Sequence, residues 1–330
     1  MNADKALENE ILSVDNENSF NNLALKVFEL QKHNLPIYGA YIKSLPAHFQ
    51  SPDHYSKIPF LPIEFFKTHR VIDPSLDPEI TFYSSGTTGT TPSKHFVAKR
   101  EWYEKVYSDT FKQFFGKPDQ YCILALLPSY LEREGSSLVE MVSGLIVQSH
   151  HPESGFYLNE FKKLCKVLLD LKAKNQKTIL IGVTFGLLDF IEKYQLVFPE
   201  LIVMETGGMK GRRNELLREE VHALLKKGFG IEQVHSEYGM TELLSQAYSK
   251  GNGIFKTPAQ MKILIRDIND PFSLLGDEQS GGINIIDLGN LYSCSFIATQ
   301  DLGKKFKDGS FEVLGRFDNS DVRGCNLLVV

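Results

Sequence analysis

The sequence lacks the cysteine pattern of zinc-binding and disulfide-stabilised proteins. It contains four cysteines, none of which belongs to a CxxC pair: Cys122, Cys165, Cys294 and Cys325. Zinc sites and disulfide frameworks usually need closely and regularly spaced cysteines, so we expect neither. Reduced thiols in a cytosolic protein are the expectation.

An excess of basic residues is also missing. The chain has 36 Lys and Arg against 41 Asp and Glu, which gives a net charge of -5. Proteins that bind nucleic acids usually carry a basic patch or stripe. We therefore expect no nucleic-acid partner.

Long apolar runs are absent as well. The apolar segments at residues 121–127 and 178–183 are far shorter than the roughly 20 residues that a membrane helix needs. The N-terminus has neither the basic start nor the apolar stretch of a secretory signal. The sequence thus predicts a cytoplasmic protein without a membrane span.

What the sequence does contain is an ordinary globular composition with many phenylalanines. Hydrophobic residues make up 42% and charged residues 23%, with 23 Phe against a single Trp. We expect a core or a substrate channel rich in Phe.

The order of apolar segments predicts an α/β fold. The first ~70 residues have helical periodicity, for example at Leu23, Val27 and Leu30. From residue 80 onward, predicted strands alternate with predicted helices, which is typical of a largely parallel sheet. The predicted strands are 80–85, 121–127, 178–183, 201–208 and 231–239, and the predicted helices are 99–115, 136–146, 160–174, 185–194 and 214–227. After residue 251 short strands follow one another. We therefore predict a helical segment plus α/β core at residues 1–250 and a β-rich subdomain at residues 251–330.

A loop rich in Gly, Ser and Thr follows the first predicted strand of this core. It reads YSSGTTGTTPSK from Tyr83 to Lys94. Glycines permit tight turns, and successive N–H groups and hydroxyls can surround phosphate oxygens. Lys94 would neutralise phosphate charge, whereas we expect the Ser93 hydroxyl to matter little. The predicted phosphate ligands are Ser84, Ser85, Gly86, Thr87, Thr88 and Gly89.

The loop alone leaves two interpretations open. It does not have the GxxxxGK[ST] spacing of a P-loop. A flexible surface loop of the same composition is the structural alternative.

Four motifs together resemble the adenylate-forming superfamily of acyl-CoA synthetases, adenylation domains and beetle luciferases. SSGTTGTTPSK is similar to its phosphate loop, although a Ser precedes the final Lys where the family usually has Pro-Lys. YGMTE, TQDLG and GRFD follow in the family's order, similar to its YGxTE signature, TGD-type strand end and GRxD segment. The resemblance implies the fold of that family's N-terminal domain and ATP-dependent conversion of a carboxylic acid to its acyl-AMP.

The resemblance also implies roles for individual residues. Asp301 would bind the ribose hydroxyls, and Tyr238 would flank the adenine. Thr241 would contact the α-phosphate, Glu242 would hold Mg²⁺, and Arg316 would approach the ribose or a phosphate. Each alone has an ordinary structural explanation, such as a turn cap or a surface ion pair. The predicted small residues of the nucleotide pocket are Gly207, Gly208 and Gly239.

A finer resemblance is to the LuxE-type acyl-protein synthetases of the bacterial fatty-acid reductase. Four stretches carry it: IPFLPIEFFK, ETGGMKGRR, HSEYGMTE and VLGRFDNSDVRGCNLLVV. It implies transfer of the acyl group from AMP to Cys325 and then to a partner protein, such as an acyl reductase or a carrier. The alternative for Cys325 is a small apolar residue packed in a core.

The sequence departs from acyl-CoA synthetases after the GRFD motif. Those enzymes continue with a domain of roughly 100 residues that carries a catalytic lysine. Here that domain is expected to be missing, and Lys94, Lys210 or a partner's cation would replace the lysine. Two alternatives stay open: an acyl-CoA, aryl-CoA or acyl-carrier ligase, and a non-catalytic nucleotide-binding scaffold.

Overall fold

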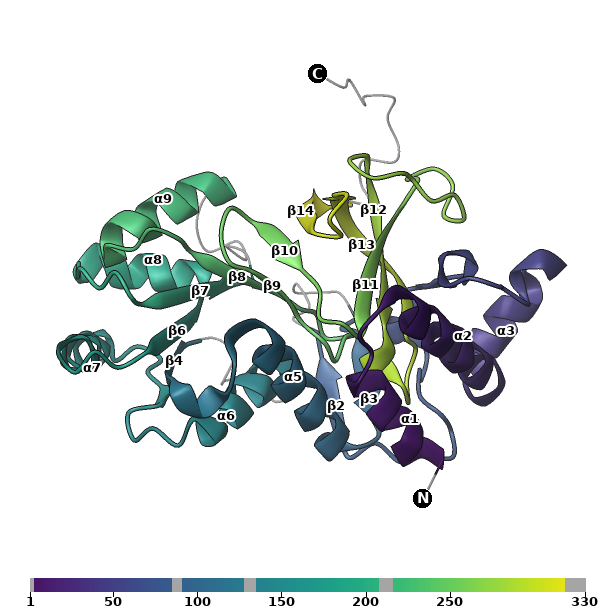
Figure 1. The fold of residues 1–330 in the computed structure, drawn as a ribbon, viewed down its shortest axis with the longest axis horizontal. Helices are drawn as coiled ribbons and strands as arrows, with labels where there is room; N and C mark the ends of the chain where they lie inside the picture. The colour runs from purple at the N-terminus through teal and green to yellow at the C-terminus, as the bar shows by residue number, and fades with distance from the viewer. Residues whose placement is uncertain (1–2, 85–90, 128–134, 208–215, 318–330) are drawn as a thin grey trace.

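The computed structural model describes residues 3–84, 91–127, 135–207 and 216–317. Within these residues 12 strands form one sheet, in the order β11-β12-β13-β14-β10-β9-β8-β7-β6-β4-β5 with β1 beside β13. The strands β2 (Ile80–Tyr83) and β3 (Lys94–Val97) form a separate hairpin. Figure 1 shows the large sheet running through both halves of the molecule.

One half of the sheet is parallel and covered by helices on both faces. Its strands are β4 (Cys122–Leu126), β5 (Gly155–Phe156), β6 (Thr178–Val183), β7 (Ile202–Thr206) and β8 (His235–Tyr238). The helices are α5 (Arg100–Phe115), α6 (Ser137–Ser149), α7 (Phe161–Ala173), α8 (Thr184–Lys193) and α9 (Arg218–Phe229).

Strand β4 shows why this half folds as it does. Cys122, Leu124 and Leu126 pack into a core with α7, α8 and α9, whereas Ile123 and Ala125 pack into the core that contains α5 and α6. A strand buried on both faces needs an unbroken apolar sequence, which CILAL supplies.

The other half is antiparallel and contains most of the C-terminal strands. They are β9 (Ala247–Ser249), β10 (Ile254–Lys256), β11 (Met261–Arg266), β12 (Ser280–Asp287), β13 (Phe296–Lys305) and β14 (Phe311–Arg316). The short strand β1 (Leu61–Pro62) runs parallel to β13. The 3₁₀ helix η4 (Leu288–Asn290) begins the turn between β12 and β13.

Helices at the N-terminus cover the antiparallel half (Figure 1). They are α1 (Ala3–Leu12), α2 (Glu17–Asn34) and α3 (Pro36–Ser44). In the short α4 (Phe65–Thr68), Phe66 packs against His95 of the hairpin strand β3. The side chain of Asn16 caps α2, and Phe28 of this helix packs against Phe296 of β13 at 6.2 Å between ring centroids. The remaining 3₁₀ helices are η1 (Ala47–Phe49), η2 (Tyr55–Lys57) and η3 (Pro118–Gln120).

The predicted α/β class is confirmed. The predicted helices and apolar strands of the core lie within a few residues of the expected positions, whereas the sequence did not predict β1, β3, β5, β9 or β10. The proposed boundary at residue 250 falls between the paired strands β9 and β10, and the division into two domains stays a prediction. In the described part of the chain, no helix is long and apolar enough to cross a membrane.

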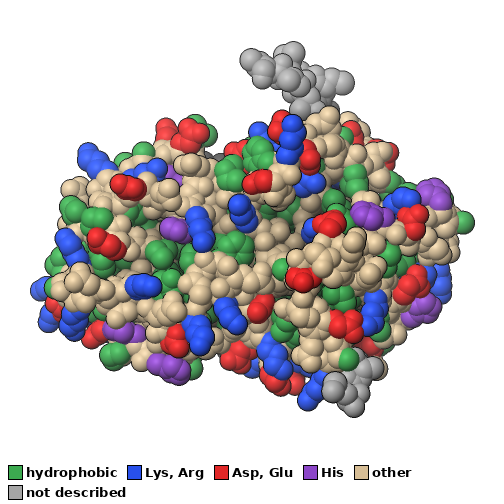
Figure 2. Space-filling model, in the orientation of Figure 1, with side chains coloured by type: hydrophobic (Ala, Val, Ile, Leu, Met, Phe, Trp, Pro, Cys, Tyr) green, Lys and Arg blue, Asp and Glu red, His purple; other side chains and the backbone are tan. Residues whose placement is uncertain are grey.

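Charged side chains of both signs are interspersed over the visible face of the molecule (Figure 2). This mixture agrees with the small net charge of the sequence. The visible face therefore carries no extended field of one sign.

Candidate nucleotide-binding site

Three residues from separate predicted motifs meet through their side chains, although β9 and β10 lie between β8 and β14 in the sheet. They are Tyr238 at the end of β8, Asp301 of β13 and Arg316 of β14. The hydroxyl of Tyr238 donates to the Asp301 carboxylate at 2.8 Å. Arg316 pairs opposite Asp301 in the β13–β14 ladder, and its Nε lies 3.4 Å from the Asp301 carboxylate. The structure thus brings Tyr238, Asp301 and Arg316 into one cluster.

Asp301 is the electrostatic centre of this cluster. Burial raises the pKa of Asp301, while the Tyr238 hydrogen bond and the Arg316 charge oppose the rise. The side chain of Arg316 is 68% exposed, so the ion pair is screened by water and adds little stability. An exposed guanidinium next to a carboxylate is instead available to an anionic ligand.

Arg266, which the sequence analysis missed, supports the strand that carries Asp301. Its guanidinium donates to the main-chain oxygens of Thr299 at 2.6 Å and Ile283 at 2.8 Å. The Thr299 hydroxyl in turn accepts from the Asp301 N–H at 3.1 Å. The only sequence signal was an arginine at the end of the apolar strand MKILIR.

Glu242 lies in the segment after β8. A hydrogen bond connects it to the hairpin of β2 and β3, which carries the predicted phosphate loop and which we call the phosphate-loop hairpin. The side chain of Glu242 is buried and hydrogen-bonds to Ser93, and burial raises the pKa of Glu242 while this bond opposes the rise. The Ser93 N–H donates to the Ser84 hydroxyl at 2.8 Å, so both ends of the loop are joined. The sequence did not reveal this contact between Ser93 and Glu242, and we expected the Ser93 hydroxyl to matter little.

Lys94 stands at the end of the same loop and is exposed. It is the first residue of β3 and pairs opposite Tyr83 of β2. The loop therefore connects the two strands of a β-hairpin, and the Tyr83–Lys94 pair fixes where it begins and ends.

The carboxyl ends of the parallel strands carry a second polar group that the sequence analysis missed. Thr206 at the end of β7 donates to Glu237 of β8 at 2.5 Å. Burial raises the pKa of Glu237 to about 7, and nearby Glu205 adds to the rise. In open α/β sheets, ligands bind at this edge of the strands. The signal in the sequence was the charged residue Glu237 within the short strand HSEY.

Two of the predicted glycines also lie at this edge. Gly207 follows β7 with a φ of 67°, a conformation that favours glycine. A Cβ on Gly239 would lie 2.4 Å from the Glu237 carboxylate, so a larger residue would displace that carboxylate. Both positions therefore require a small residue for structural reasons.

Several predicted residues lie outside the described part of the chain. They are Ser85, Gly86, Thr87, Thr88, Gly89, Gly208, Lys210 and Cys325. Their predicted roles stay predictions.

The three described cysteines differ in burial. Burial raises the pKa of Cys122 to about 11 and that of Cys294 to about 12. Cys165 is partly exposed. Because the thiolate is the nucleophile, Cys122 and Cys294 are unsuited to that role.

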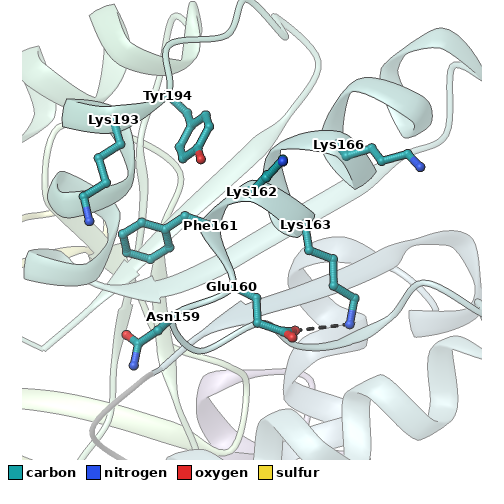
Figure 3. Close-up of a pocket in the computed structure, with 8 residues that line it drawn as sticks. All are labelled: Asn159, Glu160, Phe161, Lys162, Lys163, Lys166, Lys193 and Tyr194. Carbon is teal, nitrogen blue, oxygen red and sulfur yellow. Dashed lines mark hydrogen bonds and ion pairs between the residues drawn. The ribbon is translucent and has the colours of Figure 1, made fainter.

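A cleft of about 630 Å³ lies elsewhere, between the start of α7 and the end of α8 (Figure 3). The rings of Phe161 and Tyr194 line it together with four lysines: Lys162, Lys163, Lys166 and Lys193. None of the residues predicted for nucleotide binding lines this cleft, so it is separate from the candidate site.

Glu242 is compatible with a Mg²⁺ ligand. Among the described residues, no group of three or more His, Cys, Asp or Glu could hold a metal ion. Mg²⁺ in nucleotide sites is bound through one or two carboxylates together with water and substrate phosphates. A single buried carboxylate beside the predicted phosphate loop therefore fits this kind of site.

Comparisons by sequence find no match among protein families or curated proteins. Solved structures do match. ATP-bound MatB from Rhodopseudomonas palustris superposes with a TM-score of 0.52 at 19% identity, over 72% of this chain and 47% of that chain. A long-chain-fatty-acid-CoA ligase (FadD1) from Archaeoglobus fulgidus superposes with a TM-score of 0.53 at 14% identity, over 74% of this chain and 52% of that chain.

The chain shares the fold of these two proteins over 72% and 74% of its length. It spans about half the length of these two structures. The shared fold confirms the predicted fold class. At 19% and 14% identity, the likeness shows the fold alone.

Proposed function

We propose that the chain activates a carboxylic acid, with a fatty acid as the expected class, as its acyl-AMP at the expense of ATP. The observation that supports this most is the contact between Tyr238 and Asp301, 2.8 Å apart. These residues come from two motifs 63 positions apart in the sequence, in a fold shared with an ATP-bound protein. An aromatic ring beside a carboxylate suits an adenine and its ribose, since the carboxylate accepts hydrogen bonds from two hydroxyls.

In the proposed first step, a carboxylate oxygen of the acid attacks the α-phosphorus of ATP. The bond from that phosphorus to the bridging oxygen breaks, and pyrophosphate leaves. Asp301 and Tyr238 would orient the nucleoside, while Lys94 and Arg316 would neutralise phosphate charge. Mg²⁺, when bound through Glu242, would neutralise the charge of the leaving pyrophosphate.

In the proposed second step, the Cys325 thiolate attacks the acyl carbon of acyl-AMP. A C–S bond forms, the C–O bond to the phosphate breaks, and AMP leaves. The thioester would then be delivered to a partner protein such as an acyl reductase or a carrier. The motif Arg323-Gly324-Cys325 and the resemblance to acyl-protein synthetases support this step.

Coenzyme A as the acceptor is the second candidate. The observation in its favour is the shared fold with a long-chain-fatty-acid-CoA ligase. A non-catalytic scaffold is less well supported, because the described candidate residues Tyr238, Glu242 and Asp301 occupy one region of the structure and a scaffold has no need of all three.

Replacing Cys325 distinguishes these acceptors. We expect Cys325→Ser to keep acid-dependent ATP–pyrophosphate exchange and to form no hydroxylamine-labile acyl-protein, because a serine hydroxyl is far less ionised than a thiol near neutral pH. Mass spectrometry after incubation with ATP and a labelled fatty acid locates the adduct. Cys165→Ser is the matched control, since Cys165 is the partly exposed thiol among the described residues.

Two results would contradict acyl transfer to Cys325. One is a thioester on Cys165 or another cysteine, and the other is equal labelling of Cys325→Ser and the unmodified protein. Exchange without any acyl-protein, together with CoA-dependent release of AMP, would favour the CoA ligase.

A further inference from the structure

The described residues 239–246, which include Thr241 and Glu242, form neither helix nor strand. They connect β8 to β9, and most of the segment is buried. A buried segment outside regular structure must satisfy its main-chain polar groups in another way. Here side chains from distant parts of the chain do so.

Three buried residues, His95, Asp287 and Asn290, make these contacts, and we call them the buried polar cluster. Asn290 donates from Nδ2 to the main-chain oxygen of Glu242 at 2.7 Å. Asp287 accepts from the N–H groups of Leu244 and Ser245, both at 2.9 Å. The main chain is thus held directly at Glu242 and again two residues later.

His95 holds the residue before Glu242. Its Nδ1 lies 2.8 Å from the main-chain oxygen of Thr241, and its Nε2 lies 2.9 Å from the Ser293 hydroxyl. A carbonyl oxygen can only accept, so Nδ1 carries the proton and donates. Burial lowers the pKa of His95 to about 4, although the Thr241 bond opposes the fall, so the ring is neutral near pH 7. His95 directly follows Lys94 and so joins the phosphate-loop hairpin to this segment.

The N-terminal helix α2 supports the cluster from the other side. The buried side chain of Gln31 donates to the main-chain oxygens of Asn290 at 2.9 Å and Leu291 at 3.1 Å. Its Oε1 accepts from the Ser295 N–H at 2.9 Å. These hydrogen bonds of Gln31 therefore fix the turn that contains Asn290.

We infer that His95 and Asn290 are positioning residues that hold Thr241 and Glu242 in place for the nucleotide and its metal ion, and that Gln31 extends this support to the N-terminal helices. The inference rests on the proposed function. It assigns a role in the site to helix α2, which carries none of the motifs that resemble the adenylate-forming family.

Substitutions of Asn290 and His95 test the inference through the Mg²⁺ dependence of acid-dependent ATP–pyrophosphate exchange. Asn290→Asp removes the donor to Glu242, because an ionised carboxylate only accepts. We expect about a tenfold or greater loss of the maximal rate and a higher Mg²⁺ concentration for half-maximal exchange, since small misplacements of reacting groups cost about that much or more.

His95 allows a rescue experiment. The amide nitrogen of His95→Asn can replace the Nδ1 donor to Thr241, whereas His95→Phe has no donor. We expect His95→Asn to retain several-fold more exchange activity than His95→Phe. The control is Ser149→Ala, which removes part-buried hydrogen bonds to Ile146 and Ser154. Ser154 accepts from Ile123 of β4, which β6 and β7 separate from β8 in the sheet.

Amide hydrogen exchange gives a second measurement that needs no catalysis. We expect faster deuterium uptake in a peptide covering residues 239–246 for Asn290→Asp, His95→Phe and Gln31→Leu, and unchanged uptake there for Ser149→Ala. If Asn290→Asp does not fold, the two His95 variants provide the test.

The outcomes separate the inference from the proposed function. No pyrophosphate exchange by the unmodified protein with any acid would contradict the proposed function, and the hydrogen-exchange result would still decide whether the cluster fixes the segment. Unchanged deuterium uptake in all three variants would overturn the inference. So would normal rate and Mg²⁺ dependence of ATP–pyrophosphate exchange in Asn290→Asp and His95→Phe.

Discussion

Asp301 and Glu242, the two carboxylates predicted to contact the nucleotide and its metal ion, are held in different ways. Asp301 lies inside β13 and pairs with Arg316 of β14; on the β12 side the register is irregular beside it, and its N–H donates to the Thr299 hydroxyl. Glu242 lies in an irregular segment, and its main chain depends on Asn290 and His95, whose contacts reach across 48 and 146 positions of sequence. The position of Glu242 is therefore more sensitive to distant substitutions than that of Asp301.

The largest expected effect comes from removing either carboxylate. We expect Asp301→Ala and Glu242→Ala each to lower the rate of acyl-AMP formation about 100-fold or more, the usual cost of losing one positioned charge contact. Stability should change little, because burial already raises the pKa of both carboxyls and disfavours their charged forms. Pyrophosphate release and a thermal unfolding curve measure the two effects.

The two variants should also differ in their dependence on Mg²⁺ and ATP. Only Glu242→Ala should change the dependence on Mg²⁺, whereas Asp301→Ala should weaken the binding of ATP. Near-normal pyrophosphate release from both purified variants would contradict the assignment of this site.

A third buried carboxyl, Glu237, is expected to affect stability. Burial raises its pKa from 4.5 to about 7, so the folded protein holds this proton more tightly than the unfolded chain. The stability that results is fully present below pH 4.5 and is lost as the pH rises through about 7. The difference corresponds to roughly 3 kcal/mol in the free energy of unfolding.

Glu237→Gln should remove this dependence. We expect the variant to gain urea resistance relative to the unmodified protein at pH 8 and to gain none at pH 4.5. Exposed Glu232→Gln is the control and should change the urea midpoint little at either pH. Parallel urea curves of Glu237→Gln and the unmodified protein across this range would show that Glu237 ionises normally.

The smallest expected effects concern the phosphate-loop hairpin. Lys94→Ala should raise the ATP concentration needed for half-maximal adenylation about tenfold, because the Lys94 ammonium would neutralise phosphate charge and alanine cannot. Ser93→Ala should cost only a few-fold, through the lost hydrogen bond to Glu242. Identical kinetics for Lys94→Ala and the unmodified protein would place the phosphates elsewhere.

Local sequence patterns predicted the long helices and the buried core strands of the fold, but they did not predict the shortest strands. The apolar run CILAL and the helical periodicity of residues 100–115 give β4 and α5 directly. Strands β9 and β10 have only three residues each, which is too short for periodicity to show, and they form because β8 and β14 pair with them.

In the candidate site too, residues in local motifs were predicted, whereas residues that act through long-range contacts were not. Tyr238, Asp301 and Arg316 belong to recognisable motifs, and the structure brings them together. Gln31, Asn290 and Arg266 belong to none of those motifs, because their importance arises from hydrogen bonds formed only after distant elements have packed. A single sequence contains no local signal for such contacts.

The most direct test of the proposed function is ATP–pyrophosphate exchange with a panel of fatty and aromatic acids, measured for the unmodified protein and for Asp301→Ala. We predict exchange that requires both Mg²⁺ and a matching acid, and that falls about 100-fold or more in the variant. Exchange that is absent with every acid, or that is equal in the two proteins, would contradict the conclusion that this cluster activates a carboxylic acid.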